Sequence, residues 1–317
     1  MLIHSGKETE FFYNKGNSDY LLVTFNEIAL LADGTSYWGK PMIEQNGISA
    51  IGVVSRKPNF FMPRDDIDEF LARHGDLIRN FKGDIVLMGH SMGAFGAIKF
   101  SKAFGADTVI ASCPIYSLNR SVRRSPVRPT EPFYIPELHD DMHPKLGELS
   151  GRIFYLYDPW HPWSKSPARF QEIGYPDLHF IKLPFTDHET IKVFAADDLM
   201  LKLIEKARRG DAAELQKFAS DRRRKWKLRL QIDTAKRALR NPKSAWRIYE
   251  GHQDAFSAAY MLLLSRALAD RMPREAERIA RRMTEIAPNF VPGQKQLASL
   301  HAQRNRLTEL SPPDRAS

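Results

Sequence analysis

Short apolar runs alternate with amphipathic stretches over the first two thirds of the chain. A run such as residues 84–88 (DIVLM) is typical of a buried strand, whereas residues 63–81 have apolar side chains at helical spacing. Pro63 and the aspartates after it suit the first turn of that helix, and residues 92–104 predict another. Strands are predicted at residues 20–25, 49–54, 84–88, 107–112, 152–157 and 178–183. Strands separated by helices indicate an α/β fold, with a mostly parallel sheet and helices on both faces.

One long connection interrupts this pattern. Residues 114–150 have little periodicity and contain six prolines, which argues against a long helix or a central strand. A long irregular segment between two strands is often a lid or binding loop, so we expect a lid-like insertion in a domain spanning residues 1–200. A surface excursion without a role is the alternative.

No strand pattern returns after about residue 187, and helices are expected to about residue 308. Apolar side chains form one face of residues 255–267, and Pro273 begins a further helix that ends before Pro288. We therefore expect an all-α C-terminal extension over residues 201–308. Its end resembles one weakly matching tetratricopeptide-type hairpin, or an ordinary helical hairpin, and residues 309–317 are expected to be disordered.

The net charge of +9 is concentrated in this extension. Residues 206–247 contain fifteen basic and four acidic side chains, a local charge of +11, so the rest of the 317-residue chain is close to neutral. Basic helices bind acidic proteins or anionic membranes, although a solvated helix face is the simpler interpretation. No recognised nucleic-acid-binding module is present, so a specific nucleic-acid partner is not expected.

The remaining composition is that of an ordinary globular protein, with 43% hydrophobic and 27% charged residues. The single cysteine, Cys113, rules out an intrachain disulfide, and no export signal or transmembrane segment is expected. A cytoplasmic enzyme is the simplest interpretation of these features.

The most specific chemical motif is Gly89-His90-Ser91-Met92-Gly93. It fits Gly-x-Ser-x-Gly, and it stands between a predicted strand and a predicted helix, which is the context of a nucleophile elbow. In that turn the serine hydroxyl is exposed at the carboxyl end of the sheet. We therefore expect Ser91 to be a nucleophile; a structural turn with a locally bonded serine is the alternative.

A serine needs a base to remove its proton, and in this fold the order along the chain is serine, acid, histidine. His188 follows the last predicted strand and is the expected base. Asp158 directly follows the strand at residues 152–157, so it is the expected acid that orients His188. Asp177 and Asp187 are rivals, and Asp187 is poorly placed to bond the ring because it is adjacent to His188 in sequence.

An oxyanion hole needs two backbone N–H groups. One is expected from Met92, directly after the nucleophile, and the other from the loop after an early strand, where we nominate Phe25 or Asn26.

Three side chains are predicted to contact substrate: His90, Trp38 and Trp160. Aromatic side chains suit an acyl or sugar pocket, although most aromatic residues of the chain are expected in the core. His139 and His143, with the acidic residues between them, form only a weak candidate for metal binding, so no metal and no other cofactor is predicted.

The segments VLMGHSMGAFGAIKFS, ASCPIYS, FYLYDPWHPW and LPFTDHE together resemble bacterial α/β-hydrolase-fold, serine esterase-like proteins. The resemblance covers roughly residues 20–195, and the elbow is its specific part. It implies a triad of Ser91, Asp158 and His188 and acyl-ester chemistry without a cofactor. The His-Gly-Gly-Gly oxyanion motif of lipase-like members is absent after residues 20–25, which leaves the second oxyanion donor open.

Three functions follow from this sequence. The first is a serine hydrolase that cleaves a small-molecule or glycan acyl ester through an acyl-enzyme. The second is an acyltransferase on the same triad. The third is a non-catalytic binding protein that uses the helical extension as its interaction surface.

Overall fold

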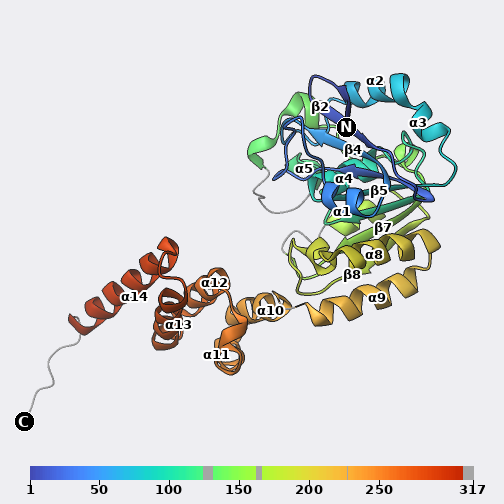
Figure 1. Ribbon diagram of the computed structural model, residues 1–317. Helices are drawn as coiled ribbons and strands as arrows, with labels where there is room; N and C mark the ends of the chain where they lie inside the picture. The colour runs from blue at the N-terminus through green and yellow to red at the C-terminus, as the bar shows by residue number, and fades with distance from the viewer. Residues whose placement is uncertain (124–130, 162–165, 227, 310–317) are drawn as a thin grey trace, which may run out of the picture. The chain divides into compact units, whose positions relative to one another are not determined.

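The computed structural model describes residues 1–123, 131–161, 166–226 and 228–309. The chain divides into two compact units, Met1–Arg224 and Lys225–Ser317. Each unit is described separately below (Figure 1).

The first unit is built on one eight-stranded sheet with the order β1-β2-β4-β3-β5-β6-β7-β8. All pairs from β4 to β8 are parallel, and only the β1–β2 and β2–β4 pairs are antiparallel. The strands are β1 (Leu2–Ser5), β2 (Thr9–Asn14), β3 (Tyr20–Phe25), β4 (Ser49–Ser55), β5 (Asp84–His90), β6 (Thr108–Ser112), β7 (Arg152–Tyr157) and β8 (Leu178–Lys182). The six strands expected from the sequence are confirmed, with ends that agree to within two residues.

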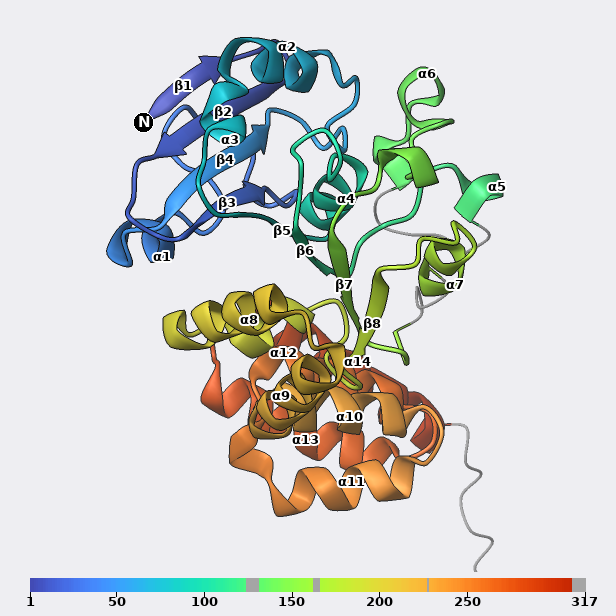
Figure 2. The same cartoon turned by 90° about the vertical axis from the view of Figure 1, so that its right-hand side faces the viewer.

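Helices cover both faces of this sheet. The helices of the first unit are α1 (Lys40–Gln45), α2 (Asp65–His74), α3 (Asp76–Arg79), α4 (Met92–Lys99), α5 (Arg120–Arg123), α6 (Pro136–His139), α7 (Ser166–Gln171), α8 (Asp197–Arg209) and α9 (Ala212–Lys225). Leu21 and Val23 of β3 pack in one core cluster with side chains of α2 and α4, while Leu22 is equally buried on the opposite face. Figure 2 shows α4 beside β5 and β6, and α8 also contacts these two strands. Burial on both faces explains why the central strands are continuously apolar. The unit therefore has the α/β-hydrolase fold: a mostly parallel sheet, covered by helices, with the turn after β5 leading into α4.

Two predicted helices are shorter in the structure. The helix expected over residues 63–81 is divided into α2 and α3 at Gly75, whose N–H bonds back to Leu71 O. Glycine favours such a break because it stabilises a helix interior least among the non-proline residues. The helix expected over residues 92–104 ends at Lys99 and continues as turns.

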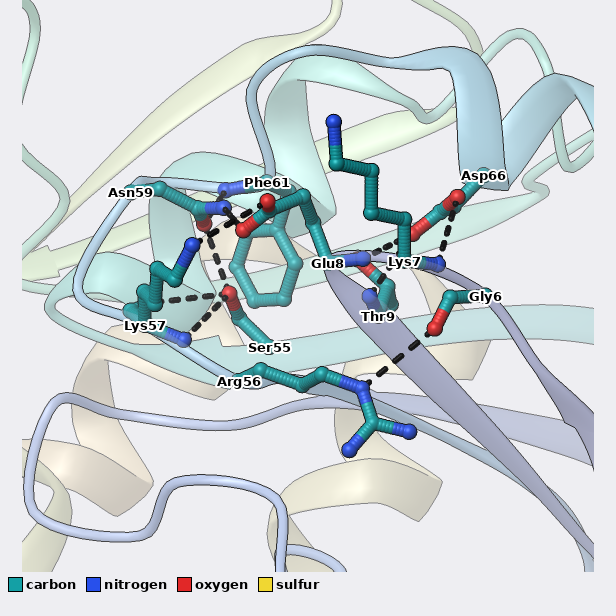
Figure 3. A network of polar contacts seen from close by, with 10 residues as sticks. All are labelled: Gly6, Lys7, Glu8, Thr9, Ser55, Arg56, Lys57, Asn59, Phe61 and Asp66. Atoms are coloured by element: carbon teal, nitrogen blue, oxygen red, sulfur yellow. Dashed lines mark hydrogen bonds and ion pairs between the residues drawn. The ribbon is translucent and has the colours of Figure 1, made fainter.

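The antiparallel β1–β2 hairpin was not predicted, and a buried carboxylate holds it in place. Asp66, in the first turn of α2, accepts hydrogen bonds from the backbone N–H groups of Lys7, Glu8 and Thr9 at 3.1, 2.6 and 2.8 Å (Figure 3). A Cβ on Gly6 would lie 2.4 Å from Asp66 Cγ, so only glycine fits there. The contact depends on residues about sixty positions apart, which local periodicity cannot reveal.

The predicted insertion at residues 114–150 contains no strand in its described part, only α5, α6 and two short 3-10 turns, Glu131–Phe133 and Leu146–Glu148. His139 of α6 fixes this segment to the loop after β4. Its Nε2 lies 3.0 Å from Asn59 O, and its Nδ1 accepts the Ile135 N–H at 2.9 Å. A role as a lid stays a prediction.

Helices α8 and α9 belong to the sheet-containing unit, so this unit extends beyond residue 200, the predicted end of the domain. Arg208 of α8 pairs with Asp19 and Asp84, which lie at the amino ends of β3 and β5. The side chain of Gln216 in α9 bonds both backbone groups of Lys182 in β8, accepting from N–H at 2.7 Å and donating to O at 3.0 Å. These contacts explain why the compact unit continues to Arg224.

The second unit is entirely helical where the structure describes it. Its helices are α10 (Leu228–Ala238), α11 (Pro242–Gly251), α12 (Ala258–Leu268), α13 (Pro273–Ile286) and α14 (Val291–Glu309), with a 3-10 turn at Gln253–Ala255. Tyr249, Leu264, Leu268, Ile279 and Met283 form its core. The apolar face predicted over residues 255–267 is wrong in part: Leu262 is buried, but Ala259 and Leu263 of that face are exposed. Helix α12 turns Leu264 and Leu268 toward the core instead. The helix predicted to begin at Pro273 is confirmed. The tetratricopeptide likeness stays a prediction, and residues 310–317 of the predicted tail lie outside the described residues.

None of the described helices combines the length and the apolar character that crossing a membrane would require. Several side chains of the basic segment form ion pairs within the chain, among them Lys206 with Glu214 and Arg237 with Asp233.

Candidate active site

The turn after β5 has the backbone geometry expected for a nucleophile. Ser91 has φ 54° and ψ −111°, a conformation that non-glycine residues rarely adopt. A Cβ on Gly93 would lie 2.2 Å from Phe25 O, and one on Gly89 would lie 2.3 Å from Gly93 O. Both glycines are therefore required, because β3, β5 and the start of α4 approach too closely for side chains at these positions.

The structure brings Ser91 and His188 together. Ser91 Oγ lies 2.9 Å from His188 Nε2, across 97 positions of sequence. His188 lies in the loop between β8 and the 3-10 turn Thr190–Phe194 (η3), and Asp187 beside it has φ 56°. The 2.9 Å between Ser91 Oγ and His188 Nε2 is a hydrogen-bond distance, so the imidazole is positioned to accept the serine proton.

Asp158 follows β7 and is 1% exposed. Its Oδ2 accepts the Asp187 N–H at 2.8 Å, and its Oδ1 accepts the Trp160 N–H at 2.9 Å. The carboxylate is thus fixed to the residue that precedes His188. Its role as the triad acid stays a prediction.

The carboxylate of Asp187, the rival acid, contacts His161. Its Oδ1 lies 2.7 Å from His161 Nε2 and also accepts the His188 backbone N–H at 2.9 Å. The His161 and His188 rings are 5.9 Å apart. His161 was missed by the sequence analysis, although it lies only three residues beyond Asp158.

His90, predicted to contact substrate, is 5% exposed and lies beside Ser91 and His188. Its ring centroid is 4.9 Å from that of His188. Burial lowers the pKa of His90 to about 4, and this effect outweighs the attraction of Glu189. The ring is therefore neutral at neutral pH, and it does not repel a positive charge on His188.

Glu27 is the second residue that the sequence analysis missed. It follows Asn26 in the loop after β3, and its Oε2 lies 3.9 Å from His90 Nε2. Burial raises the pKa of the Glu27 carboxyl, and the neighbouring Glu189 raises it further, while Lys192 opposes the shift.

The expected oxyanion donors have different surroundings. The N–H of Met92 begins α4 directly after Ser91. The N–H of Asn26 donates to Val53 O at 3.2 Å, so it is engaged in the sheet. Phe25 is the last residue of β3, and its carbonyl packs against Gly93. Among the described residues, the N–H of Glu27 donates to no partner.

The two predicted tryptophans are not in contact with Ser91 or His188 where the structure describes the chain. Trp160, in the loop after β7, is 59% exposed, and Trp38 is partly buried just before α1. Within the part of the chain that the structure describes, neither side chain bonds to Ser91 or stacks on His188. Their contact with substrate stays a prediction.

The described ranges contain no group of three or more His, Cys, Asp or Glu side chains that could hold a metal ion. His139, considered in the sequence as a weak candidate ligand, bonds protein groups through both ring nitrogens.

No family model matches this chain, and no curated protein matches it. Several solved structures are similar in fold. The capsule O-acetyltransferase of Neisseria meningitidis serogroup A shares 14% identity over 64% of this chain and 92% of its own, with a TM-score of 0.44. Mouse alpha/beta hydrolase domain-containing protein 10 shares 14% over 65% and 98%, at 0.42, and Est1E from Butyrivibrio proteoclasticus 12% over 70% and 98%, at 0.40. At this level of identity the similarity concerns the fold alone.

Proposed function

We propose that this protein is a serine hydrolase that cleaves an acyl ester through a covalent acyl-enzyme on Ser91. The single observation that carries the proposal is the 2.9 Å hydrogen bond between Ser91 Oγ and His188 Nε2, formed on a strained turn between β5 and α4. A serine hydroxyl that is held against a base in this way is activated for attack on a carbonyl carbon.

The reaction proceeds in two halves. Ser91 Oγ attacks the acyl carbon while its proton passes to His188 Nε2, and the carbonyl oxygen becomes an oxyanion. When this intermediate collapses, the ester C–O bond breaks and the leaving alcohol takes the proton from His188. Water then attacks the acyl-enzyme by the same route, releasing the acid and restoring Ser91.

Three further groups assist the proposed reaction. Asp158 is the triad acid: it is buried, hydrogen-bonded to the backbone beside His188, and placed in chain order between serine and histidine. The oxyanion is held by the N–H groups of Met92 and Glu27. Glu27 replaces Asn26 in this role because the Asn26 N–H is engaged with Val53 O.

The first test is labelling with a fluorophosphonate probe, which reacts only with an activated serine. We expect wild type to be labelled on the peptide that contains Ser91, and Ser91→Ala and His188→Ala to remain unlabelled. His252→Ala, an exposed histidine of the second unit, is the matched control and should be labelled as wild type. A folded wild type that takes no label would refute the catalytic proposal and leave the non-catalytic binding function.

A second test separates hydrolysis from acyl transfer. The acyl-enzyme is formed from p-nitrophenyl acetate, and its products are counted in water and in water containing glycerol. Release of acetate alone supports a hydrolase. If the ratio of acetylated glycerol to acetate exceeds the ratio of glycerol hydroxyl groups to water molecules in the solution, the result favours an acyltransferase with the same catalytic residues.

A further inference from the structure

A series of hydrogen bonds beside Ser91 and His188 connects the ends of β5 and β6 with the segment that carries His188. His90 Nδ1 lies 3.2 Å from Ser112 Oγ, and Ser112 Oγ lies 2.6 Å from Thr190 Oγ1. Thr190 Oγ1 also lies 3.0 Å from Cys113 Sγ. The same sulfur atom lies 3.9 Å from Asp187 O, to which its S–H donates. This series of hydrogen bonds thus runs from His90, the residue before Ser91, to Asp187, the residue before His188.

Thr190 is the central member of this series. It is fully buried and lies two positions after His188, at the start of η3. A hydroxyl donates one proton and accepts on the same oxygen, so Thr190 can bond to Ser112 and Cys113 at the same time. It therefore attaches the His188 loop to the carboxyl end of β6, in the middle of the sheet.

The connected segments are conformationally strained. Ser91, Cys113 and Asp187 have φ values of 54°, 51° and 56°, all in the left-handed region. Such a conformation is unfavourable for a non-glycine residue and persists only where surrounding contacts hold it. The hydrogen-bond series supplies contacts of this kind at His90, next to Ser91, and at Asp187, next to His188.

We propose that Thr190 is a positioning residue, whose hydroxyl holds the His188 loop so that Nε2 stays within hydrogen-bond distance of Ser91. This inference rests on the proposed serine hydrolase function. Thr190 touches neither reacting atom, and it acts on catalysis by fixing where His188 lies.

The test compares Thr190→Val, which keeps the shape but removes the hydroxyl, with Thr190→Ser, which keeps the hydroxyl. We measure kcat and KM for p-nitrophenyl acetate and the rate of fluorophosphonate labelling. A displacement of catalytic groups by about 1 Å costs about 100-fold, so Thr190→Val should lose up to about 100-fold in kcat and labelling rate. KM should change little, and Thr190→Ser should keep most of the activity.

Thr234→Val is the matched control. Thr234 of α10 is also fully buried, and its hydroxyl donates to Leu230 O at 2.7 Å within the second unit. This variant loses a buried hydroxyl of the same kind, far from Ser91 in the chain, and should keep wild-type kcat. Thermal unfolding of all variants shows whether each is folded under the assay conditions.

The outcomes separate the two proposals. A wild type that is not labelled overturns the hydrolase function and the role of Thr190 with it. A labelled wild type with Thr190→Val at the wild-type rate, or with Thr190→Ser as impaired as Thr190→Val, overturns the role of Thr190 alone. If Thr190→Val does not fold, Ser112→Ala and Cys113→Ala each remove one of its two bonds. Unchanged labelling in both would then overturn the role.

Discussion

Protonation of His90 should destabilise the sheet-containing unit, and a change of pH from about 7 to about 5 is the perturbation that tests this. His90 is buried between the elbow and the His188 loop, and its pKa is lowered from the ordinary 6.5 to about 4. His90→Asn removes the titrating ring, while the Asn side chain can still bond to Ser112 Oγ as Nδ1 does.

The magnitude follows from the two pKa values. Because the folded pKa is the lower one, the unfolded chain binds more protons between pH 6.5 and about pH 4. The stability that the neutral ring contributes is therefore complete above pH 6.5 and is lost as the pH falls toward 4. Proton linkage gives a loss of about 2 kcal/mol between pH 7 and pH 5, and of about 3 kcal/mol in total.

The assay is equilibrium unfolding in urea. Brief deuterium labelling of the β5 and β6 amides measures the unfolded fraction at each urea concentration, so the signal reports on the first unit alone. Wild type should lose about 2 kcal/mol more than His90→Asn between pH 7 and pH 5. Other histidines with lowered pKa values, such as His139 and His143, titrate in both proteins and cancel in the difference. Equal pH dependence in the two proteins would refute the reasoning.

Three further predictions concern single positions of the first unit. Thr24→Val should leave the unfolding free energy unchanged or raise it by up to about 1 kcal/mol in urea unfolding, because Thr24 Oγ1 is buried without a partner among the described residues. Cys113 should resist iodoacetamide in the folded protein at neutral pH and react after denaturation, because burial raises the pKa of its thiol to about 12. Gly93→Ala should lower the melting temperature and abolish fluorophosphonate labelling, because the new Cβ would lie 2.2 Å from Phe25 O; a stable, labelled variant would contradict this.

Much of the fold is encoded in local sequence pattern. Continuous apolar runs identified six strands because a parallel sheet buried on both faces leaves no polar alternation. The β1–β2 hairpin was missed because its position depends on Asp66, a distant side chain that bonds three backbone N–H groups. The break at Gly75 was missed because the apolar spacing continues across it.

In the candidate site, too, some residues are recognisable from local sequence and others depend on long-range contacts. Ser91 and His188 were nominated from chain order and the flanking elements, and the structure brings their side chains within hydrogen-bond distance. Glu27, His161 and Thr190 were not nominated, because their relevance depends on which loops meet at the carboxyl edge of the sheet. That meeting is set by strand order, and β3 lies beside β5 although β4 separates them in sequence.

The bond between Gln216 and the backbone of Lys182 has a consequence for self-association. β8 is the last strand of the sheet, and a free strand edge is a template for pairing with a second molecule. The Gln216 amide satisfies one N–H and one C=O of that edge, as a neighbouring strand would. A shortened chain that ends before α9 would expose this edge, and edge-to-edge joining of sheets from different copies would become its main route to aggregation.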